Sequence, residues 1–415
     1  MDQSAPPPEP QPRPAEKPRQ RRRSARARRP RQRQRAIMLS AVAALAVAAV
    51  AWAAVGCAGG RPVHHPRASA AAAPLHRPSQ SHSVQFVVGA SGDLLIHSAI
   101  FERALVLGGG SHYNFAPFFE QIKPYIQGAD LPLCHVETPM TPAPPTGYPT
   151  FNTPPALATA IAQTGWRACS TAATHTLDQG QTGVDDTIRA LDRAGVLHTG
   201  SFSSAAAQAT PLIMTVKGVR VAFLAYTELT NGIPSPHPWS VNRASAAQIL
   251  SDAHRARTDG AQVVIVNIHW GDEDVARPSS FQLALASTLT RSPDITAVVG
   301  QHVHIVQPIR ILHGKLVVFG EGNLISNQTS ACCPAASQDG MIVLLTITVD
   351  SRGARVSFVH YVPVWVRHPD YLVLPAGTAW RTDPAAAAAL RASYARTVAV
   401  AGRGPRIQPI PAHLP

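Results

Sequence analysis

The chain has 415 residues, enough for one large domain or two small ones, and a formal net charge of +13. Residues 1–35 hold eleven Arg and one Lys against three acidic residues, so most of the charge lies there. We predict that this basic segment is disordered and cytoplasmic, because it cannot bury enough apolar surface to offset its ordering entropy. No aromatic or recognition element follows it, so the composition argues against a nucleic-acid-binding domain and we expect no nucleic-acid partner.

The next segment predicts export. Residues 36–56 carry no charge and are long enough to cross a bilayer as a helix. The Arg-rich run before them places the N-terminus in the cytoplasm and the rest of the chain outside. Cys57 follows in "AVGCAGG", which is typical of a bacterial lipoprotein signal, although Ala54 stands where a larger aliphatic residue is usual. A lipidated Cys57 and a plain single-pass anchor therefore both remain open, and both place the domain on the extracytoplasmic face of the membrane.

An α/β domain is expected after a linker. Residues 58–82 are rich in Ala, Pro, His and Ser, which is typical of a linker. From residue 83 to about 380, short Val- and Ile-rich runs alternate with amphipathic helical patterns, which predicts an α/β fold with a largely parallel core. Late in this domain, "GMIVLLTITVD" and "RVSFVHYVPVWV" follow one another without a helix and predict an antiparallel pair. Residues 381–415 predict a helix and then a Pro-rich tail.

The cysteines match no zinc-binding spacing. Cys134 and Cys169 lie in apolar, strand-like runs, and we interpret them as small buried hydrophobic residues. An exported domain can form a disulfide, but the sequence assigns none. The adjacent Cys332 and Cys333 fall in a loop to which we attach no function.

Carboxylates and imidazoles follow most of the predicted strands. In an open α/β sheet, ligands bind outside the carboxyl ends of the strands, so we expect these side chains to share one site. One histidine at a strand end is usually structural, but six such ends in one chain are hard to explain as independent accidents. The residues are Asp93, His135, Glu137, His175, His269, His302, His304, Glu321 and Asn323.

These residue types predict a site for one or two divalent metal ions. Oxygen and imidazole ligands without thiolates suit Zn, Mn or Fe. His302 and His304 are two residues apart and would point the same way on a strand. Asp93 or Glu137 could bridge two ions, and such a pair would stabilise both the attacking and the leaving oxygen of a displacement.

His175, in "STAATHTLDQG", would stand beside the metal as a general acid or an outer-sphere donor. Asp178 would orient the ring of His175 through its other nitrogen. The alternative for Asp178 is an acidic residue at a helix N-terminus, favoured by the helix dipole.

The strand that ends in His269 is followed by three further residues for which we consider structural roles. We expect Trp270 to form a wall of the pocket, with a place in the core as the alternative. Asp272 and Glu273 are expected to cap a helix, with a position facing the site as the alternative. The loop "NGIPSPHPWSVN" (231–242) is interpreted equally well as a lid or as a surface loop.

The combined motifs resemble a known family. In chain order they are "GDLLIH", "CHVETPMT", "YPTFNTPPALATAIAQTGW", "STAATHTLDQG", "VNIHWGDE", "GQHVHIVQPI" and "VVFGEGNLI". Together they resemble the CapA family of poly-gamma-glutamate capsule synthesis proteins over roughly Val84 to Ile342. The resemblance implies a fold similar to that of calcineurin-like metallophosphoesterases, an α/β/β/α sandwich.

The resemblance also assigns roles by position. It implies a catalytic role for His175 and metal ligation by the residues at the family's other motif positions, with His135 standing where many members have Asn. His97 is a weaker candidate ligand, because the metallophosphoesterase pattern has a histidine two residues after the first Asp and Leu95 stands there instead. The implied metal ligands are Asp93, Glu137, His269, His302 and His304.

Thr174 departs from the family pattern, which has Asn immediately before the histidine. An Asn carbonyl can ligate a metal, whereas a Thr hydroxyl is shorter and a poorer ligand for Zn or Mn. We therefore expect a one-metal site, or a site weakened for the second ion. A site that retains the fold and ligand binding without catalysis is a further alternative.

Three functions follow as hypotheses. The first is an exported, membrane-tethered protein that assembles or handles an anionic polymer such as poly-gamma-glutamate, with membrane synthases as partners. The second is a metal-dependent phosphoesterase with an extracytoplasmic substrate. The third is a non-catalytic binding or scaffold protein with a degenerate metal site. The resemblance alone favours the first, because a fold does not determine a reaction.

Overall fold

The computed structural model describes residues 83–413. The predicted basic segment, the apolar segment with Cys57 and the linker that follows lie outside this range. Among the residues within it, no helix combines the length and the apolar character that crossing a bilayer requires.

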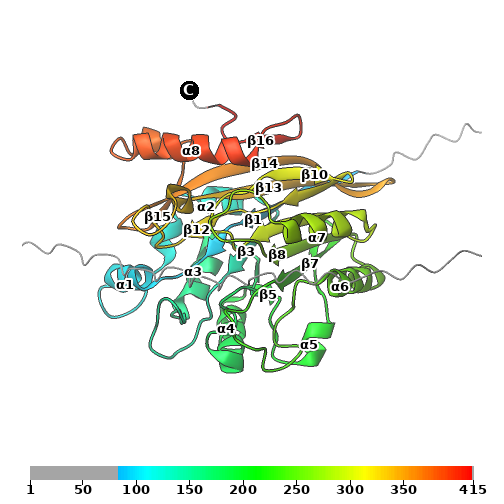
Figure 1. The fold of residues 1–415 in the computed structure, drawn as a ribbon, viewed down its shortest axis with the longest axis horizontal. Helices are drawn as coiled ribbons and strands as arrows, with labels where there is room; N and C mark the ends of the chain where they lie inside the picture. Colours follow the sequence, from blue (N-terminus) through cyan, green and yellow to red (C-terminus); the bar gives the residue numbers. More distant parts are fainter. Residues whose placement is uncertain (1–82, 414–415) are drawn as a thin grey trace, which may run out of the picture. The chain divides into compact units, whose positions relative to one another are not determined.

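Two sheets form the centre of the fold (Figure 1). The first has the order β12-β2-β3-β1-β13-β14-β15, with β4 and β5 continuing beside β3 and with β16 pairing with β14; the second has the order β10-β11-β9-β8-β7-β6. The strands of the first sheet are β1 (Val84–Ser91), β2 (Asp93–Leu94), β3 (Leu131–Val136), β4 (Ala168–Ser170), β5 (Leu197–Thr199), β12 (Asn323–Ile325), β13 (Asp339–Asp350), β14 (Gly353–Arg367), β15 (Leu372–Pro375) and β16 (Ile407–Pro409). Those of the second are β6 (Leu212–Val216), β7 (Val219–Thr227), β8 (Val263–His269), β9 (Ala297–Gln301), β10 (Ile309–Leu312) and β11 (Lys315–Val318).

The strand directions make this a mixed α/β fold. In the second sheet β11, β9, β8 and β7 run parallel, and only its edge strands β10 and β6 pair antiparallel. In the first sheet a parallel group around β3 adjoins the antiparallel strands β13, β14 and β15. The predicted antiparallel pair is confirmed as β13 and β14. The expectation of a largely parallel core holds for the second sheet and only for half of the first.

Alternation along the strands explains the layers. In β7, Val221 and Phe223 belong to the apolar core between the two sheets, whereas Ala222 and Leu224 pack against the outer helices. Because successive strand residues face opposite sides, strands that are apolar throughout can bury both faces. The result is an α/β/β/α arrangement.

Helices cover both outer faces (Figure 1). Those on the first sheet share one core with it, those on the second share another, and the C-terminal α8 packs along β14. The helices are α1 (Ser98–Leu107), α2 (Lys123–Gln127), α3 (Ala156–Thr164), α4 (Gly180–Ala194), α5 (Ala205–Ala209), α6 (Ala246–Thr258), α7 (Ser280–Arg291) and α8 (Ala387–Ala401), with short 3-10 turns at Ala116–Phe119, Ala335–Gln338 and Ala379–Arg381.

A disulfide joins Cys134 of β3 to Cys169 of β4. The two residues are direct partners across parallel strands, with their Cα atoms 4.4 Å apart, within the range that a disulfide requires. Both cysteines are buried, as predicted, but they are joined in a disulfide that the sequence did not assign. The bond lies one residue before His135 and Ser170, and so it fixes two strands that carry polar groups toward the same end of the sheet.

Candidate metal centre

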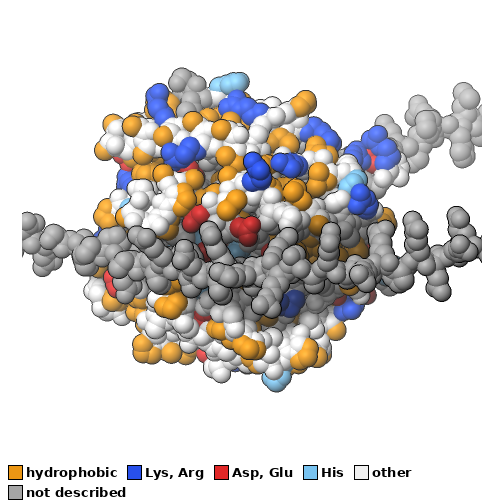
Figure 2. Space-filling model, viewed as in Figure 1, with side chains coloured by type: hydrophobic (Ala, Val, Ile, Leu, Met, Phe, Trp, Pro, Cys, Tyr) orange, Lys and Arg blue, Asp and Glu red, His pale blue; other side chains and the backbone are white. Residues whose placement is uncertain are grey.

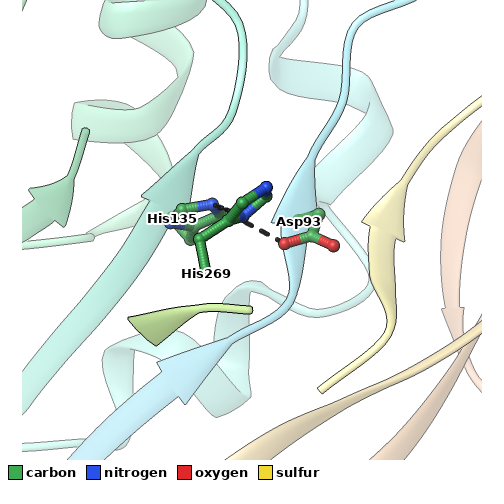
Figure 3. A group of neighbouring side chains, drawn as sticks. All are labelled: Asp93, His135 and His269. Atoms are coloured by element: carbon green, nitrogen blue, oxygen red, sulfur yellow. Dashed lines mark hydrogen bonds and ion pairs between the residues drawn. The ribbon is translucent and has the colours of Figure 1, made fainter. Parts of the chain in front are cut away.

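The carboxyl ends of strands from both sheets meet at one buried polar site. Asp93 begins β2 and pairs with His135 of β3, while His269 is the last residue of β8. Figure 3 shows these three side chains pointing toward one another from three different strands. All three are fully buried, at 0% exposure. The predicted convergence of strand ends is thus present in the structure.

Two overlapping groups of possible metal ligands share Glu137. Asp93, Glu137 and His304 form one group, and Glu137, His269 and His302 form the other; within each, the ligand atoms lie within 4.8 Å of one another. These are the five residues that the sequence predicts as ligands. A shared carboxylate between two three-ligand groups is the arrangement that two bridged ions require.

Glu137 is the residue that best tests whether a metal fits. It is 1% exposed, and within the described part of the chain neither of its carboxylate oxygens has a hydrogen-bond partner. Its Oε1 lies 3.7 Å from His269 Nε2 and 4.0 Å from His304 Nε2. Burying a carboxylate without partners is costly, and a cation held between these donors would remove the cost. The residues therefore fit a divalent ion.

The histidines of the site differ in the direction in which their surroundings shift the pKa. Burial lowers the pKa of His302 to about 4 and also lowers the pKa of His269, so both stay neutral at neutral pH, which is the form that binds metals. Burial also acts against protonation of His304, but the carboxylates of Glu137 and Asp93 outweigh it and raise the pKa of His304 to about 10. Burial raises the pKa of Glu137 well above its usual range.

His302 and His304 reach the site from a turn, which corrects the expectation that they share a strand. β9 ends at Gln301, and both histidines have left-handed backbones, with φ of 93° and 59°. The backbone N–H of His302 donates to Asp93 Oδ2 at 3.2 Å, which holds this turn against the start of β2. The side chain of His304 is in turn held by Asn323, whose Oδ1 lies 3.0 Å from His304 Nδ1.

Thr174 lies inside the second ligand group. Its Oγ1 is 2.9 Å from His269 Nε2 and 3.3 Å from His302 Nδ1. A longer side chain at this position would place an oxygen among the ligands of that group. The structure thus puts Thr174 at the place where the sequence predicts a missing Asn ligand.

His175 and Asp178 form a hydrogen-bonded pair. His175 Nδ1 donates to Asp178 Oδ2 at 2.7 Å, and the same oxygen accepts from the backbone N–H of Phe151 at 2.7 Å. Asn231 Nδ2 donates to Asp178 Oδ1 at 2.9 Å. Asp178 precedes α4 rather than lying within it, so its geometry is that of a residue that orients His175. The Asn231 contact also ties the loop 231–242 to this pair.

The two secondary candidates differ in position. His135 belongs to the site, with its Nε2 2.9 Å from His269 Nδ1 and 3.7 Å from Asp93 Oδ1. His97 is absent from the ligand groups found among residues 83–413. Its Nδ1 accepts from the backbone N–H of Asn327, and burial lowers its pKa to about 3.

The residues after His269 are placed differently from the expectation. Glu273 forms a further ligand group with His302 and His304, although its side chain is exposed. It does not cap a helix, because Ser279 is the N-cap of the next helix, α7. Trp270 is fully buried in the core between β8 and the outer helices, and its indole N–H donates to Phe319 O at 2.9 Å. The signal for Glu273 in the sequence is the acidic pair Asp272–Glu273, which follows the strand-end His269 after two intervening residues.

An α/β/β/α fold with carboxylates and imidazoles gathered at the meeting strand ends defines a protein with a candidate divalent-metal centre. Residues 87–328, more than half of the chain, match the family described as bacterial capsule synthesis protein PGA_cap. The chain belongs to this family, and the resemblance to CapA proteins is confirmed.

Several curated relatives carry capsule-related names. The chain is 26% identical over 274 residues to the capsule biosynthesis protein CapA of Bacillus anthracis, covering 63% of this chain and 64% of the relative. It is 27% identical over 207 residues to a probable polyglutamine synthesis accessory protein of Mycobacterium tuberculosis, covering 46% and 53%. In both comparisons the chain spans less than two thirds of the relative's length.

Solved structures with a similar arrangement include phosphoesterases. The calcineurin-like phosphoesterase YfkN from Bacillus subtilis has a TM-score of 0.44 and 13% identity, with 75% of this chain and 100% of that chain covered. A phosphatase from Mycoplasma pneumoniae has a TM-score of 0.43 and 12% identity, with 70% and 97% covered.

Proposed function

We propose that the protein is an exported, membrane-tethered accessory protein in the synthesis or handling of an anionic envelope polymer such as poly-gamma-glutamate, and that it acts through a divalent-metal site. Family membership and the names of the relatives support the polymer. The observation that carries the metal-dependent role is the buried carboxylate of Glu137, which has no hydrogen-bond partner among residues 83–413 and lies between two groups of imidazoles and carboxylates.

The metal would be Mn, Zn or Fe, held by Asp93, Glu137 and His304 in one position and by Glu137, His269 and His302 in the other. Such ions supply Lewis acidity toward a carbonyl or phosphoryl oxygen. Asp93 accepts the backbone N–H of His302, and this contact keeps the two ligand groups at a fixed separation.

His175 is the residue best placed to move a proton. Its Nδ1–H is committed to Asp178, which leaves Nε2 to hold a proton for a leaving group. Asp178 accepts hydrogen bonds from two further groups, so the imidazole ring is held in one orientation.

Two features support the proposed location outside the cytoplasmic membrane. One is the sequence of residues 1–57, with its basic run, its uncharged stretch and Cys57. The other is the disulfide between Cys134 and Cys169, because disulfides persist mainly in oxidising compartments. A membrane synthase would then be the partner on the same surface. On the face shown in Figure 2, most of the Lys and Arg side chains left uncovered lie over the upper part of the view, where an anionic polymer would meet them.

A phosphoesterase is the second candidate. Two three-ligand groups that share one carboxylate suit an in-line displacement at phosphorus as well as attack on an amide. Thr174 favours a third candidate, a scaffold with a weakened site, because a hydroxyl replaces the expected amide ligand.

Metal analysis and turnover by the purified full-length chain in detergent test the proposal. We expect at least one bound Mn, Zn or Fe, a melting temperature that rises on adding the ion, and binding or cleavage of poly-gamma-glutamate that is lost in Glu137→Gln. Turnover of an aryl phosphate without any effect on the polymer would favour the phosphoesterase. No bound metal and no rise in melting temperature would contradict the metal-dependent role.

A further inference from the structure

A continuous line of buried polar side chains leads from β8, through β4 and β3, back to the end of β8. The Ser170 hydroxyl donates to Asn267 Oδ1 at 3.0 Å. The hydroxyl oxygen of Ser170 also lies 2.5 Å from His135 Nδ1. His135 Nε2 lies 2.9 Å from His269 Nδ1. These four residues are at most 2% exposed, so within the described chain their polar atoms depend on one another.

The chemistry of the first member gives every hydrogen bond in the line a direction. An amide oxygen only accepts, so the Ser170 proton points to Asn267 and its oxygen must accept from His135 Nδ1–H. His135 Nε2 then carries a lone pair and accepts from His269 Nδ1–H. The proton of neutral His269 is therefore on Nδ1, which leaves a lone pair on Nε2, 3.7 Å from Glu137 Oε1.

A competing arrangement makes His135 a ligand. Its Nε2 is 3.7 Å from Asp93 Oδ1, and Asp93, His135 and His269 also form a possible ligand group (Figure 3). In that case the lone pair of His269 would have to be on Nδ1, and its proton would point from Nε2 toward Glu137. The two arrangements thus place the proton of His269 on opposite ring nitrogens.

We propose that His135 is a positioning residue and not a metal ligand. Together with Ser170 and Asn267 it fixes the tautomer of His269, so that Nε2 faces Glu137 and is available to a divalent ion. The line from Asn267 favours this arrangement, because it leaves a lone pair on His135 Nε2. In the competing arrangement this lone pair would face that of His269 Nδ1 at 2.9 Å unless an ion lay between them, whereas here the two nitrogens share one proton. The consequence for metal binding depends on the proposed function, whereas the tautomer does not.

The tautomer can be read without any metal. Full-length chain labelled with ¹⁵N-histidine, in detergent and treated with a chelator, is examined by long-range ¹H–¹⁵N correlation, and His269 is assigned by its loss in His269→Asn. We expect the Nδ1–H tautomer in the wild-type chain and a mixture in Ser170→Ala. An Nε2–H tautomer in the wild-type chain would overturn the proposal.

Calorimetric titration with Mn²⁺ then tests the consequence. We expect His135→Ala to weaken binding about 10- to 100-fold with the number of bound ions unchanged, as for other groups that orient a ligand. His135→Gln should recover most of the affinity, because its amide oxygen can accept from His269 Nδ1–H. Loss of one ion in His135→Ala, or unchanged affinity, would contradict the positioning role.

His97→Ala is the matched control, since His97 is another buried histidine outside the line and its removal should leave the affinity unchanged. Circular dichroism checks that each variant is folded. If His135→Ala does not fold, Ser170→Ala, which is the smallest change, takes its place in the titration. A wild-type chain that binds no Mn²⁺ would contradict the proposed function, and the spectrum of His269 would still decide the role of His135.

Discussion

At the scale of single residues, the sequence was sufficient where a side chain follows directly from a strand end. Asp93, Glu137 and His269 could be predicted as neighbours because parallel strands deliver their carboxyl ends to one edge. The role proposed for His135 could not be predicted, because it depends on the contact of His135 with Ser170 and on the bond from Ser170 to Asn267, which belong to other strands. Such contacts are set by strand register and side-chain rotamers, which no motif records.

Thr174 gives the sharpest test at this scale. Thr174→Asn should add a carbonyl ligand beside His269 and His302, and we expect it to raise the number of bound ions or the affinity for the weaker one by about tenfold. Metal content after dialysis and Mn²⁺ titration measure this. Thr174→Val keeps the shape without the oxygen and is the control. An unchanged stoichiometry and affinity in Thr174→Asn would show that the site is not weakened at this position.

At the scale of elements, periodicity predicted β13, β14 and the helices over both sheets, because their apolar patterns have clear periods. The turn after β9 was misjudged. His302 and His304 follow the strand in left-handed conformations, which is uncommon for residues other than Gly and so is not suggested by the spacing. The disulfide was also missed, because it depends on the register of β3 on β4.

The disulfide between β3 and β4 gives a prediction about stability. Its two cysteines are 35 residues apart, and removing such a link should lower the free energy of unfolding by roughly 2–4 kcal/mol. Denaturant unfolding of Cys134→Ser/Cys169→Ser should show this loss, and wild-type protein should show a similar one after reduction. Cys332→Ser/Cys333→Ser should behave as the wild type. Equal stability of all three proteins would mean that the Cys134–Cys169 bond does not form in solution.

At the scale of the whole molecule, the structure buries several neutral imidazoles, and this makes stability depend on pH. Burial lowers the pKa of His97 to about 3 from an unfolded value near 6.5, so at pH between these values the unfolded chain binds the extra proton. This contribution to stability should therefore be fully present above pH 6.5 and be lost as the pH decreases toward 3. His135 and His302, each with a pKa lowered to about 4, act in the same direction.

His97 isolates this effect because it lies outside the ligand groups. Between pH 7.5 and pH 5 its burial should account for a loss of about 2 kcal/mol in the free energy of unfolding. In the metal-free chain, His97→Gln should remove that part of the loss, as measured by denaturant unfolding at both pH values. A pH dependence as steep in His97→Gln as in the wild type would mean that His97 titrates normally.

The candidate ligands come from both sheets: Asp93 and Glu137 belong to the first, and His269 and His302 to the second. Neither sheet alone supplies all the ligands of either group that shares Glu137, so these groups form only when the two sheets pack together. An ion bound there would join the two layers, because its ligands come from both sheets. Ion binding would thereby restrict any movement of one layer relative to the other.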